Sequence, residues 1–166
     1  MTKIKNTAKI TDDVLVNEVR SAIEHRATWM GLILEEAKKE NADWEAIGRA
    51  AVSKTGCFHG KGIFDRKDND TMEAFKTAFL TDLGQKLFEM EIKECDEEKL
   101  EVEFNYCALV NGWLKQNFDD DTIKTLCDIA MDGDRAIAKE NGYEFVLGKT
   151  IAKGDDICEV NFYKKK

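Results

Sequence analysis

Residues 99–116 read KLEVEFNYCALVNGWLKQ, and this stretch decides the class of the fold. Charged and apolar residues alternate from Lys99 to Tyr106, which is typical of a β-strand with one buried face. From Ala108 onward the spacing of the apolar residues changes to that of a helix. Cys107 stands where the two patterns meet. We therefore predict a chain that combines strands and helices, with a thiol at a strand-to-helix junction.

The strand in this stretch is expected to pair with neighbours in an antiparallel sheet. Residues 88–93 alternate in the same way, and residues 95–98 can turn the chain, which predicts a hairpin. Near the C-terminus, residues 143–151 and 157–163 form a second alternating pair joined by a short polar loop. The two hairpins together predict an antiparallel sheet of about four strands.

Helical spacing precedes the first hairpin. Residues 11–37 are predicted to form one amphipathic helix, because their apolar residues recur every three to four positions. A second helix is expected over residues 43–55, ended by Gly56 at the start of the glycine-rich segment GCFHGKG, residues 56–62. Residues 70–87 have the apolar stripe of a third helix.

Two more helices are predicted between the hairpins. They cover residues 108–117 and 119–141, and the acidic residues at the start of the second suit the N-terminus of a helix. The order is therefore helices, hairpin, helices, hairpin. This order predicts an α+β fold in which an antiparallel sheet is packed by an N-terminal helical layer and two central helices.

Length and composition indicate one domain. The 166 residues can bury a core without disulfides, and we divide them into a lead-in, residues 1–10, and a single domain, residues 11–166. A net charge of −8 argues against nucleic acid as a partner. No apolar run reaches the roughly 18 residues of a membrane span, and the N-terminus lacks the apolar centre of a signal peptide. We therefore expect a cytoplasmic protein that binds a small-molecule substrate, and we leave a homo-oligomer open.

Cys107 is the first candidate for chemistry. A helix that starts directly after it would direct free backbone N–H groups and the helix dipole at the sulfur, stabilise the thiolate and lower the pKa of the thiol. The alternative is that Cys107 packs as a small buried hydrophobe, because free cysteine is among the most buried residue types. The sequence leaves both interpretations open.

A second group of candidates lies in the C-terminal half. Helical spacing places Cys127 on the face expected to meet the sheet, with Asp128 on the flank of that face. Asp128 could be a general base, or it could pair with a basic neighbour such as Arg135. Cys158 shares a strand face with apolar residues, so core packing is its default role.

A metal site is an alternative use of the cysteines. Cys107, Cys127 and Cys158, with Cys57 or His59 from the glycine-rich segment, could bind zinc tetrahedrally. No pair of cysteines has the close C-x₂-C spacing of a strong zinc motif. We therefore assign no metal ligand and no cofactor, and we keep zinc as the alternative.

The C-terminal half of the chain resembles the L-2-amino-thiazoline-4-carboxylic acid hydrolase family. The matching elements are Cys107 after a strand, the pair Cys127-Asp128 on a helix, and a T-x-A-x-G-D-x-x-C segment, here TIAKGDDIC at residues 150–158. The resemblance extends over about residues 74–163. A more distant similarity links the chain to the vinyl-reductase-like small-molecule-binding domains, which end in a similar Gly-Asp-x-x-Cys element, although the glutamate and the closely placed cysteine that usually precede it are absent.

The resemblance implies a hydrolase that opens a cyclic amidine or thiazoline to a carbamoyl-cysteine by adding water at the amidine carbon. Our hypothesis assigns Cys107 as the nucleophile or a water-orienting thiolate and Asp128 as the general base, because both match the family pattern, and it adds His59 as a proton donor to the departing sulfur. Arg135 and Lys149 are candidates to bind a substrate carboxylate. The other candidate substrate-binding residues are Asn105, Cys127 and Cys158.

Two other functions remain open at this point. The cysteines could belong to a non-catalytic small-molecule-binding or sensor domain that holds zinc. They could also simply pack in a helical interaction module. Zinc content distinguishes the first of these from a hydrolase, and the pKa of the Cys107 thiol distinguishes the second.

Overall fold

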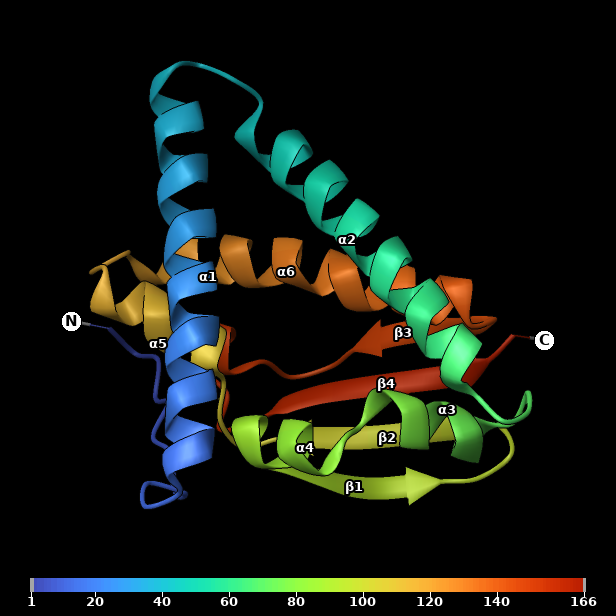
Figure 1. Cartoon of the computed structure of the whole chain (residues 1–166). Helices are drawn as coiled ribbons and strands as arrows, with labels where there is room; N and C mark the ends of the chain where they lie inside the picture. The colour runs from blue at the N-terminus through green and yellow to red at the C-terminus, as the bar shows by residue number, and fades with distance from the viewer. Residues whose placement is uncertain (1, 166) are drawn as a thin grey trace.

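The computed structural model describes residues 2–165, in which six α-helices and a four-stranded antiparallel sheet give the predicted α+β fold (Figure 1). Within those residues, no helix combines the length and the apolar character needed to cross a bilayer. In chain order the elements are α1 (Val14–Lys39), α2 (Trp44–Arg66), α3 (Met72–Phe79), α4 (Asp82–Phe88), β1 (Met90–Cys95), β2 (Lys99–Phe104), α5 (Ala108–Lys115), α6 (Asp120–Glu140), β3 (Tyr143–Leu147), the short 3-10 helix η1 (Ile151–Lys153) and β4 (Cys158–Lys164).

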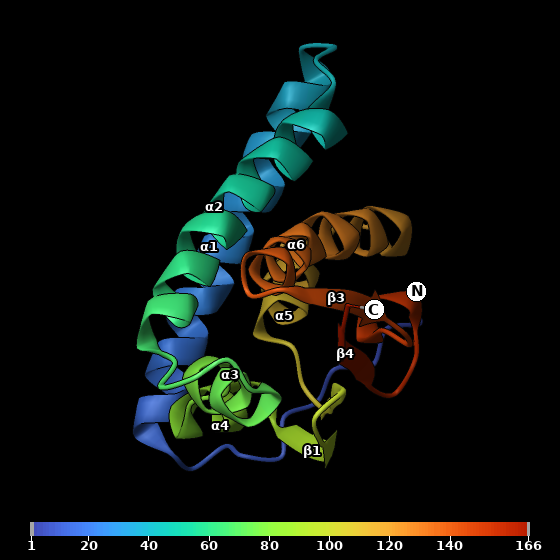
Figure 2. The same ribbon diagram turned by 90° about the vertical axis from the view of Figure 1, so that its right-hand side faces the viewer.

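Both predicted hairpins are present, and the pairing of β2 with β4 joins them in the order β1-β2-β4-β3. Apolar and acidic residues alternate along the central strands β2 and β4, so that each kind lies on one face of the sheet. Val102 and its partner Val160 are buried on one face, whereas their neighbours Glu103 and Glu159 lie on the other. Figure 2 shows the helices gathered on one side of the sheet, so that the apolar face is covered and the acidic face meets solvent.

The predicted end of the second helix at Gly56 is wrong. Helix α2 continues without a break through residues 56–62, and it packs along α6. The reason lies in the helix contact: a Cβ atom at Gly56 would lie only 2.8 Å from the Cα atom of Gly133 and would clash with the carbonyl oxygen of the same residue. The glycines that suggested a loop instead allow two helix backbones to approach closely.

The predicted third helix is divided into α3 and α4. Thr81 caps the second piece, because its hydroxyl accepts a hydrogen bond from the N–H of Gly84 at 3.0 Å. Thr71 caps the first piece in the same way. The third strand is also shorter than predicted and ends at Leu147.

A buried ion pair between Arg20 and Glu89 holds the end of the lead-in against the domain. Arg20 of α1 is 4% exposed and pairs with Glu89 at 3.0 Å, while its guanidinium also donates to backbone carbonyls at the end of α4. The carboxylate of Glu89 in turn accepts the backbone N–H groups of Lys9 and Ile10. This cluster fixes the chain before α1 relative to α1 and β1.

Helix α5 is held against α1 by a backbone contact and a tryptophan. The indole N–H of the fully buried Trp113 donates to the carbonyl oxygen of Ala27 at 2.8 Å. A Cβ atom at Gly112 would lie 2.7 Å from the carbonyl oxygen of Glu24, so only glycine allows this approach. The junction that carries Cys107 is therefore tied to the first half of α1.

We expect two glycine substitutions in α2 to have opposite effects on the free energy of unfolding. Gly56→Ala should lower it by about 1–3 kcal/mol, because the added methyl group meets the backbone of Gly133. Gly62→Ala should raise it by up to about 1 kcal/mol, because alanine favours the helix and its Cβ would have only an ordinary contact with Arg66. Urea denaturation measures both, and equal effects would contradict the proposed role of the α2–α6 contact.

Candidate active site

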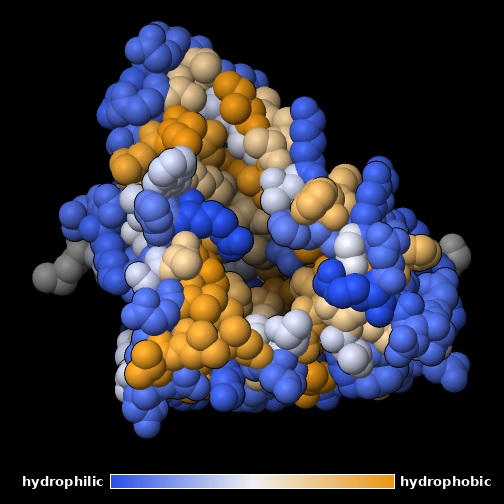
Figure 3. Space-filling model, viewed as in Figure 1, coloured by the Kyte–Doolittle hydropathy of each residue, from blue (hydrophilic) through white to orange (hydrophobic). Residues whose placement is uncertain are grey.

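The face of the molecule between α1 and α2 is hollowed where α6 crosses behind them (Figure 3). Helix α2 packs on α6, whereas α1 packs mainly on α5, so the two long helices diverge below their connecting turn. Hydrophilic and hydrophobic atoms both border the hollow. The candidate site is formed by residues that lie between α6 and the sheet.

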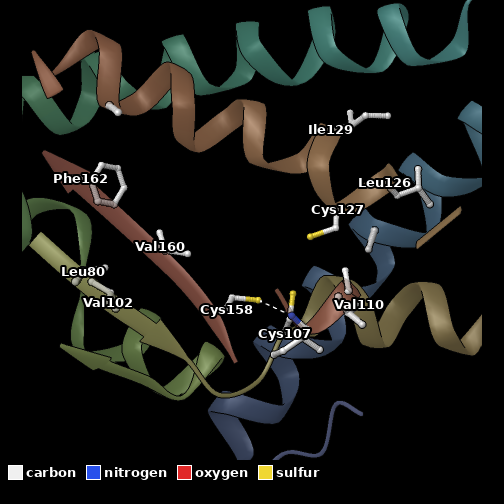
Figure 4. Packing of buried hydrophobic residues seen from close by; sticks show 14 of the residues in the cluster. Leu80, Val102, Cys107, Val110, Leu126, Cys127, Ile129, Cys158, Val160 and Phe162 are labelled. Atoms are coloured by element: carbon white, nitrogen blue, oxygen red, sulfur yellow. Dashed lines mark hydrogen bonds between the residues drawn. The ribbon is translucent and has the colours of Figure 1, made fainter. Parts of the chain in front are cut away.

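Three cysteines meet in this region. Cys127 comes from α6, Cys158 begins β4, and Cys107 precedes α5. Figure 4 shows their side chains directed toward one another in the space between α6, α5 and the start of β4. Burial is the main cause of the raised pKa of Cys127, and Cys107 and Cys158 add to the rise. All three cysteines belong to the buried hydrophobic core.

Cys107 occupies the N-cap position of α5, as the sequence pattern predicts. Asn6 holds its backbone from both sides: the amide oxygen of Asn6 accepts the N–H of Cys107 at 2.9 Å, and the amide nitrogen donates to its carbonyl at 2.8 Å. The predicted fall in thiol pKa does not occur. Burial raises the pKa of Cys107, and the N–H groups of Val110 and Leu109 oppose the rise only in part. The thiol is therefore neutral at pH 7.

The other two thiols are neutral for the same reason. Burial raises the pKa of Cys158 to about 12 and places that of Cys127 well above its ordinary value. The sulfur of Cys158 accepts a hydrogen bond from the N–H of Ile151 at 3.3 Å, which is the dashed line in Figure 4. As predicted, Cys158 lies on the buried face of its strand.

The segment that carries the family resemblance, residues 150–158, is a closed loop. The N–H of Thr150 donates to the carboxylate of Asp155 at 2.9 Å, and the N–H of Asp155 donates back to the carbonyl of Thr150 at 3.2 Å. Gly154 has a φ of 94°, a conformation that favours glycine. The Gly-Asp pair therefore shapes the loop that brings Ile151 to the sulfur of Cys158.

The zinc alternative requires several ligand side chains to lie together. Across residues 2–165, no set of three or more His, Cys, Asp or Glu side chains is arranged to hold a metal ion. Metal analysis of the purified protein tests this conclusion directly.

Asp128 and Arg135 belong to an ion-pair cluster rather than to the cysteine region. Asp128 pairs with Arg135 at 2.7 Å and with Arg49 of α2 at 2.8 Å, and these hydrogen bonds lower the pKa of the carboxyl despite its partial burial. Asp132 pairs with the same two arginines. The cluster joins α2 to α6, and both carboxylate oxygens of Asp128 are engaged by arginines.

The remaining predicted residues are also engaged or exposed. His59 lies on the exposed side of α2, with its ring edge-on to that of Phe58. Lys149 pairs with Glu159 at 3.0 Å on the outer face of the sheet. Asn105 donates to the carbonyl of Glu89 at 3.0 Å and so ties β2 to the end of α4. None of these contacts involves the three cysteines.

Asp134 is a candidate that the sequence analysis missed. It follows Cys127 by seven residues, which places the two side chains within about 20° on the same face of α6. Its side chain is only partly exposed, and desolvation raises the pKa of its carboxyl to about 6, against opposing effects of Arg135 and Arg26. Within the described chain no other side chain bonds to this carboxylate, which is thus recessed, unpaired and ready to titrate near neutrality.

Arg26 is the second missed residue. It lies on α1 next to Ala27, at the edge of the buried stripe, and its side chain is exposed. The side-chain charges that act on the thiol of Cys107 are those of Arg26 and Asp134. The charge of Arg26 therefore acts on that thiol from α1.

A separate concavity of about 390 Å³ lies between the end of α1 and the start of α6. Its charged groups already have partners. Lys39 pairs with Glu35 at 3.3 Å, and Asp119 caps α6 by accepting the N–H of Thr122. We therefore favour the hollow beneath α6 as the site of chemistry.

Fold and site together define a small α+β domain in which three buried thiols meet between α6, α5 and β4, and in which α6 carries one partly buried carboxyl of raised pKa. The match of residues 20–162 to the family model described as L-2-amino-thiazoline-4-carboxylic acid hydrolase shows that the chain belongs to this family. A search of curated proteins and a search of solved structures found no match. The matched range includes all three cysteines, Asp134 and Arg26.

Replacing Asp134 should stabilise the protein in a pH-dependent way. The folded carboxyl has a pKa of about 6 instead of 3.8, so its ionisation disfavours folding as the pH rises from about 4 to about 6, and the penalty is constant above. Asp134→Asn should therefore raise the free energy of unfolding by about 1–2 kcal/mol at pH 7.5, with little change at about pH 3, where the carboxyl is protonated in both the folded and the unfolded state.

Asp128→Asn is the matched control on the same helix. The pKa of Asp128 is lowered in the fold, so its charge stabilises the folded state at neutral pH, and its loss should reduce stability. Urea denaturation at the two pH values measures both variants. Destabilisation by Asp134→Asn at pH 7.5 would mean that its carboxylate has a partner.

Proposed function

We propose that the protein is a hydrolase that opens the ring of a cyclic amidine of the 2-amino-thiazoline-4-carboxylate type, in the cytoplasm, to a carbamoyl-cysteine product. The observation that carries the proposal is the Asp134 carboxyl, recessed and unpaired, in a chain whose family is described by this reaction. A general base works best when its pKa lies near the operating pH. Asp134 meets this condition, and Asp128 does not.

In the proposed mechanism Asp134 activates water. The water oxygen adds to the amidinium carbon between ring sulfur and nitrogen while one proton passes to the carboxylate of Asp134. When the tetrahedral intermediate collapses, the carbon–sulfur bond breaks and protonated Asp134 gives this proton to the sulfur. The hydroxyl of the intermediate loses its proton as the urea carbonyl forms. This second proton passes to Asp134 and then to solvent.

The cysteines contribute the enclosure instead of a nucleophile. A thiolate is the reactive form of cysteine, and burial opposes its formation at Cys107, Cys127 and Cys158. Neutral sulfur atoms are soft, polarizable and without formal charge, so they can pack against the sulfur and methylene of the substrate ring without placing a second anion beside the carboxylate. In this proposal Cys107 lines the site.

Substitution of Asp134 tests the proposed base. With 2-amino-thiazoline-4-carboxylate as substrate, Asp134→Asn should lower kcat/KM by about 10²–10⁴-fold, the usual contribution of a general base. Asp128→Asn is the matched control and should stay within a few-fold of the unaltered protein, because Asp128 only links α6 to α2. Release of the product thiol is followed spectrophotometrically. Equal losses in the two variants would contradict the assignment.

The pH profile provides a second test. Asp134 must be ionised to accept a proton, so kcat/KM should fall as the pH drops below about 6, the pKa of its carboxyl. The charged groups that act on this carboxyl are Arg26 and Arg135.

Cys107→Ala distinguishes water from a thiol as the nucleophile. The variant should keep at least about a tenth of kcat/KM if Cys107 only lines the site, whereas loss of a covalent nucleophile costs orders of magnitude more. A complete loss of activity in a folded Cys107→Ala protein would restore the covalent mechanism.

A further inference from the structure

We propose that two copies of this chain form a dimer through the outer face of α1 and α2. Eight of the ten large apolar side chains that are exposed among residues 2–165 belong to these two helices. Single exposed apolar residues are ordinary, whereas a group of them on one face marks an interaction surface. We define the outer face by Trp29 and Ile33 of α1 and by Ile47 and Phe58 of α2.

On α1 the apolar outer residues lie opposite the buried side of the helix. Trp29 is 62% exposed and lies two positions from the buried residues Ala27 and Gly31, so it projects about 160° away from them. Ile33 is 59% exposed and follows Trp29 by four positions, the spacing of neighbours on one side of a helix. The ring of His25 lies edge-on to that of Trp29, with 5.6 Å between their centres. The outer side of α1 therefore carries a row of rings and apolar groups.

The same arrangement occurs on α2. Gly56 and Gly60 lie against α6, and Phe58 stands between them in the sequence, so its side chain also projects about 160° away from the contact. Phe58 is 76% exposed. Ile47 is 49% exposed and precedes Phe58 by eleven positions, which places the two within about 20° on the helix. A helix that met only water would carry polar residues on this side.

The outer sides of the two helices belong to one layer. Figure 2 shows α1 and α2 at the edge of the molecule, with their connecting turn extending beyond the other elements. Figure 3 looks onto this layer and shows hydrophobic residues over both helices near that turn. Within the described chain no further element lies outside the layer. The apolar outer face is therefore open to a partner.

The exposed area of the chain supports a second copy as that partner. Its accessible surface is 9524 Å², whereas a monomeric protein of 18.9 kDa exposes about 8,300 Å² by the scaling of surface with mass. The difference between these areas is about 1,200 Å², which exceeds the roughly 800 Å² that each partner contributes to a stable interface. A two-fold dimer uses the same patch on both copies, and an apolar patch is complementary to itself. Interfaces between identical chains are also more apolar than the ordinary surface.

Glutamate substitutions on the outer face test the dimer. Sedimentation velocity at micromolar concentration should give the unaltered protein twice the mass of one chain. The double variant Trp29→Glu with Ile33→Glu should be monomeric and raise the Kd of the dimer at least about 100-fold, because unpaired charges are costly to bury. Phe58→Glu tests α2 independently and should also weaken the dimer. All three positions are more than half exposed, so far-UV circular dichroism should show unchanged folding of each chain.

Val146→Glu is the matched control. It places the same charge at a 47% exposed apolar position of β3, away from the outer face, and should leave the dimer intact. A monomeric unaltered protein would overturn the proposal, as would a dimer that persists in the α1 and α2 variants or is lost in Val146→Glu. Sedimentation of a monomeric protein with phosphatidylcholine vesicles would instead assign the outer face to a membrane surface. The mass measurement does not depend on the proposed hydrolase activity.

Discussion

The close contact between α2 and α6 is the constraint on which the rest of the structure depends. At Gly56 the two backbones approach until no side chain fits between them. This contact turns one side of α6 toward α2, and Cys127 lies on another side, from which it points toward Cys107 and Cys158. A similar glycine contact at Gly112 draws α5 to α1. Because the two long helices dock on different partners, a hollow remains between them (Figure 3).

The same packing sorts the charged residues into two groups. Asp128 and Asp132 on α6 meet Arg49 across the α2 contact and become part of a satisfied cluster. Ion pairs with this much exposure contribute little to stability, so their main effect is to fix the orientation of the helices. Asp134 lies on a different side of α6, and no side chain among residues 2–165 forms a hydrogen bond or an ion pair with it. An unpaired recessed carboxyl costs folding free energy, and such a cost is typical of functional sites.

The sequence predicted the sheet well because its signal is local. Alternation in residues 99–106 and 157–163 identified two strands and the buried face on which Cys158 lies. The continuity of α2 could not be predicted in the same way. Glycines in a helix look like the end of the helix until a second backbone is known to lie against them.

The site was harder to predict than the fold, since pairing and desolvation are tertiary properties. Asp128 and Asp134 are both acids on one helix, and only the position of Arg49 shows which of them is neutralised. The seven-residue spacing from Cys127 to Asp134 was visible in the sequence and would have been a useful signal. The sequence contains no comparable signal for Arg26. The helix start after Cys107 was predicted correctly, but the helix dipole proved a smaller influence on its thiol than burial.

Burial raises the pKa values of the cysteines and of Asp134 alike, but the chemical results are opposite. In each case desolvation disfavours the anion and raises the pKa. A thiol that starts at 9.0 then leaves the physiological range, whereas a carboxyl that starts at 3.8 and rises to about 6 enters it. Burial therefore opposes the ionisation of three candidate nucleophiles and brings the pKa of one carboxyl near the range that the proposed general base requires. The proposal accordingly gives the cysteines of the family resemblance no nucleophilic role, and the proposed acid–base chemistry falls to a residue outside that pattern.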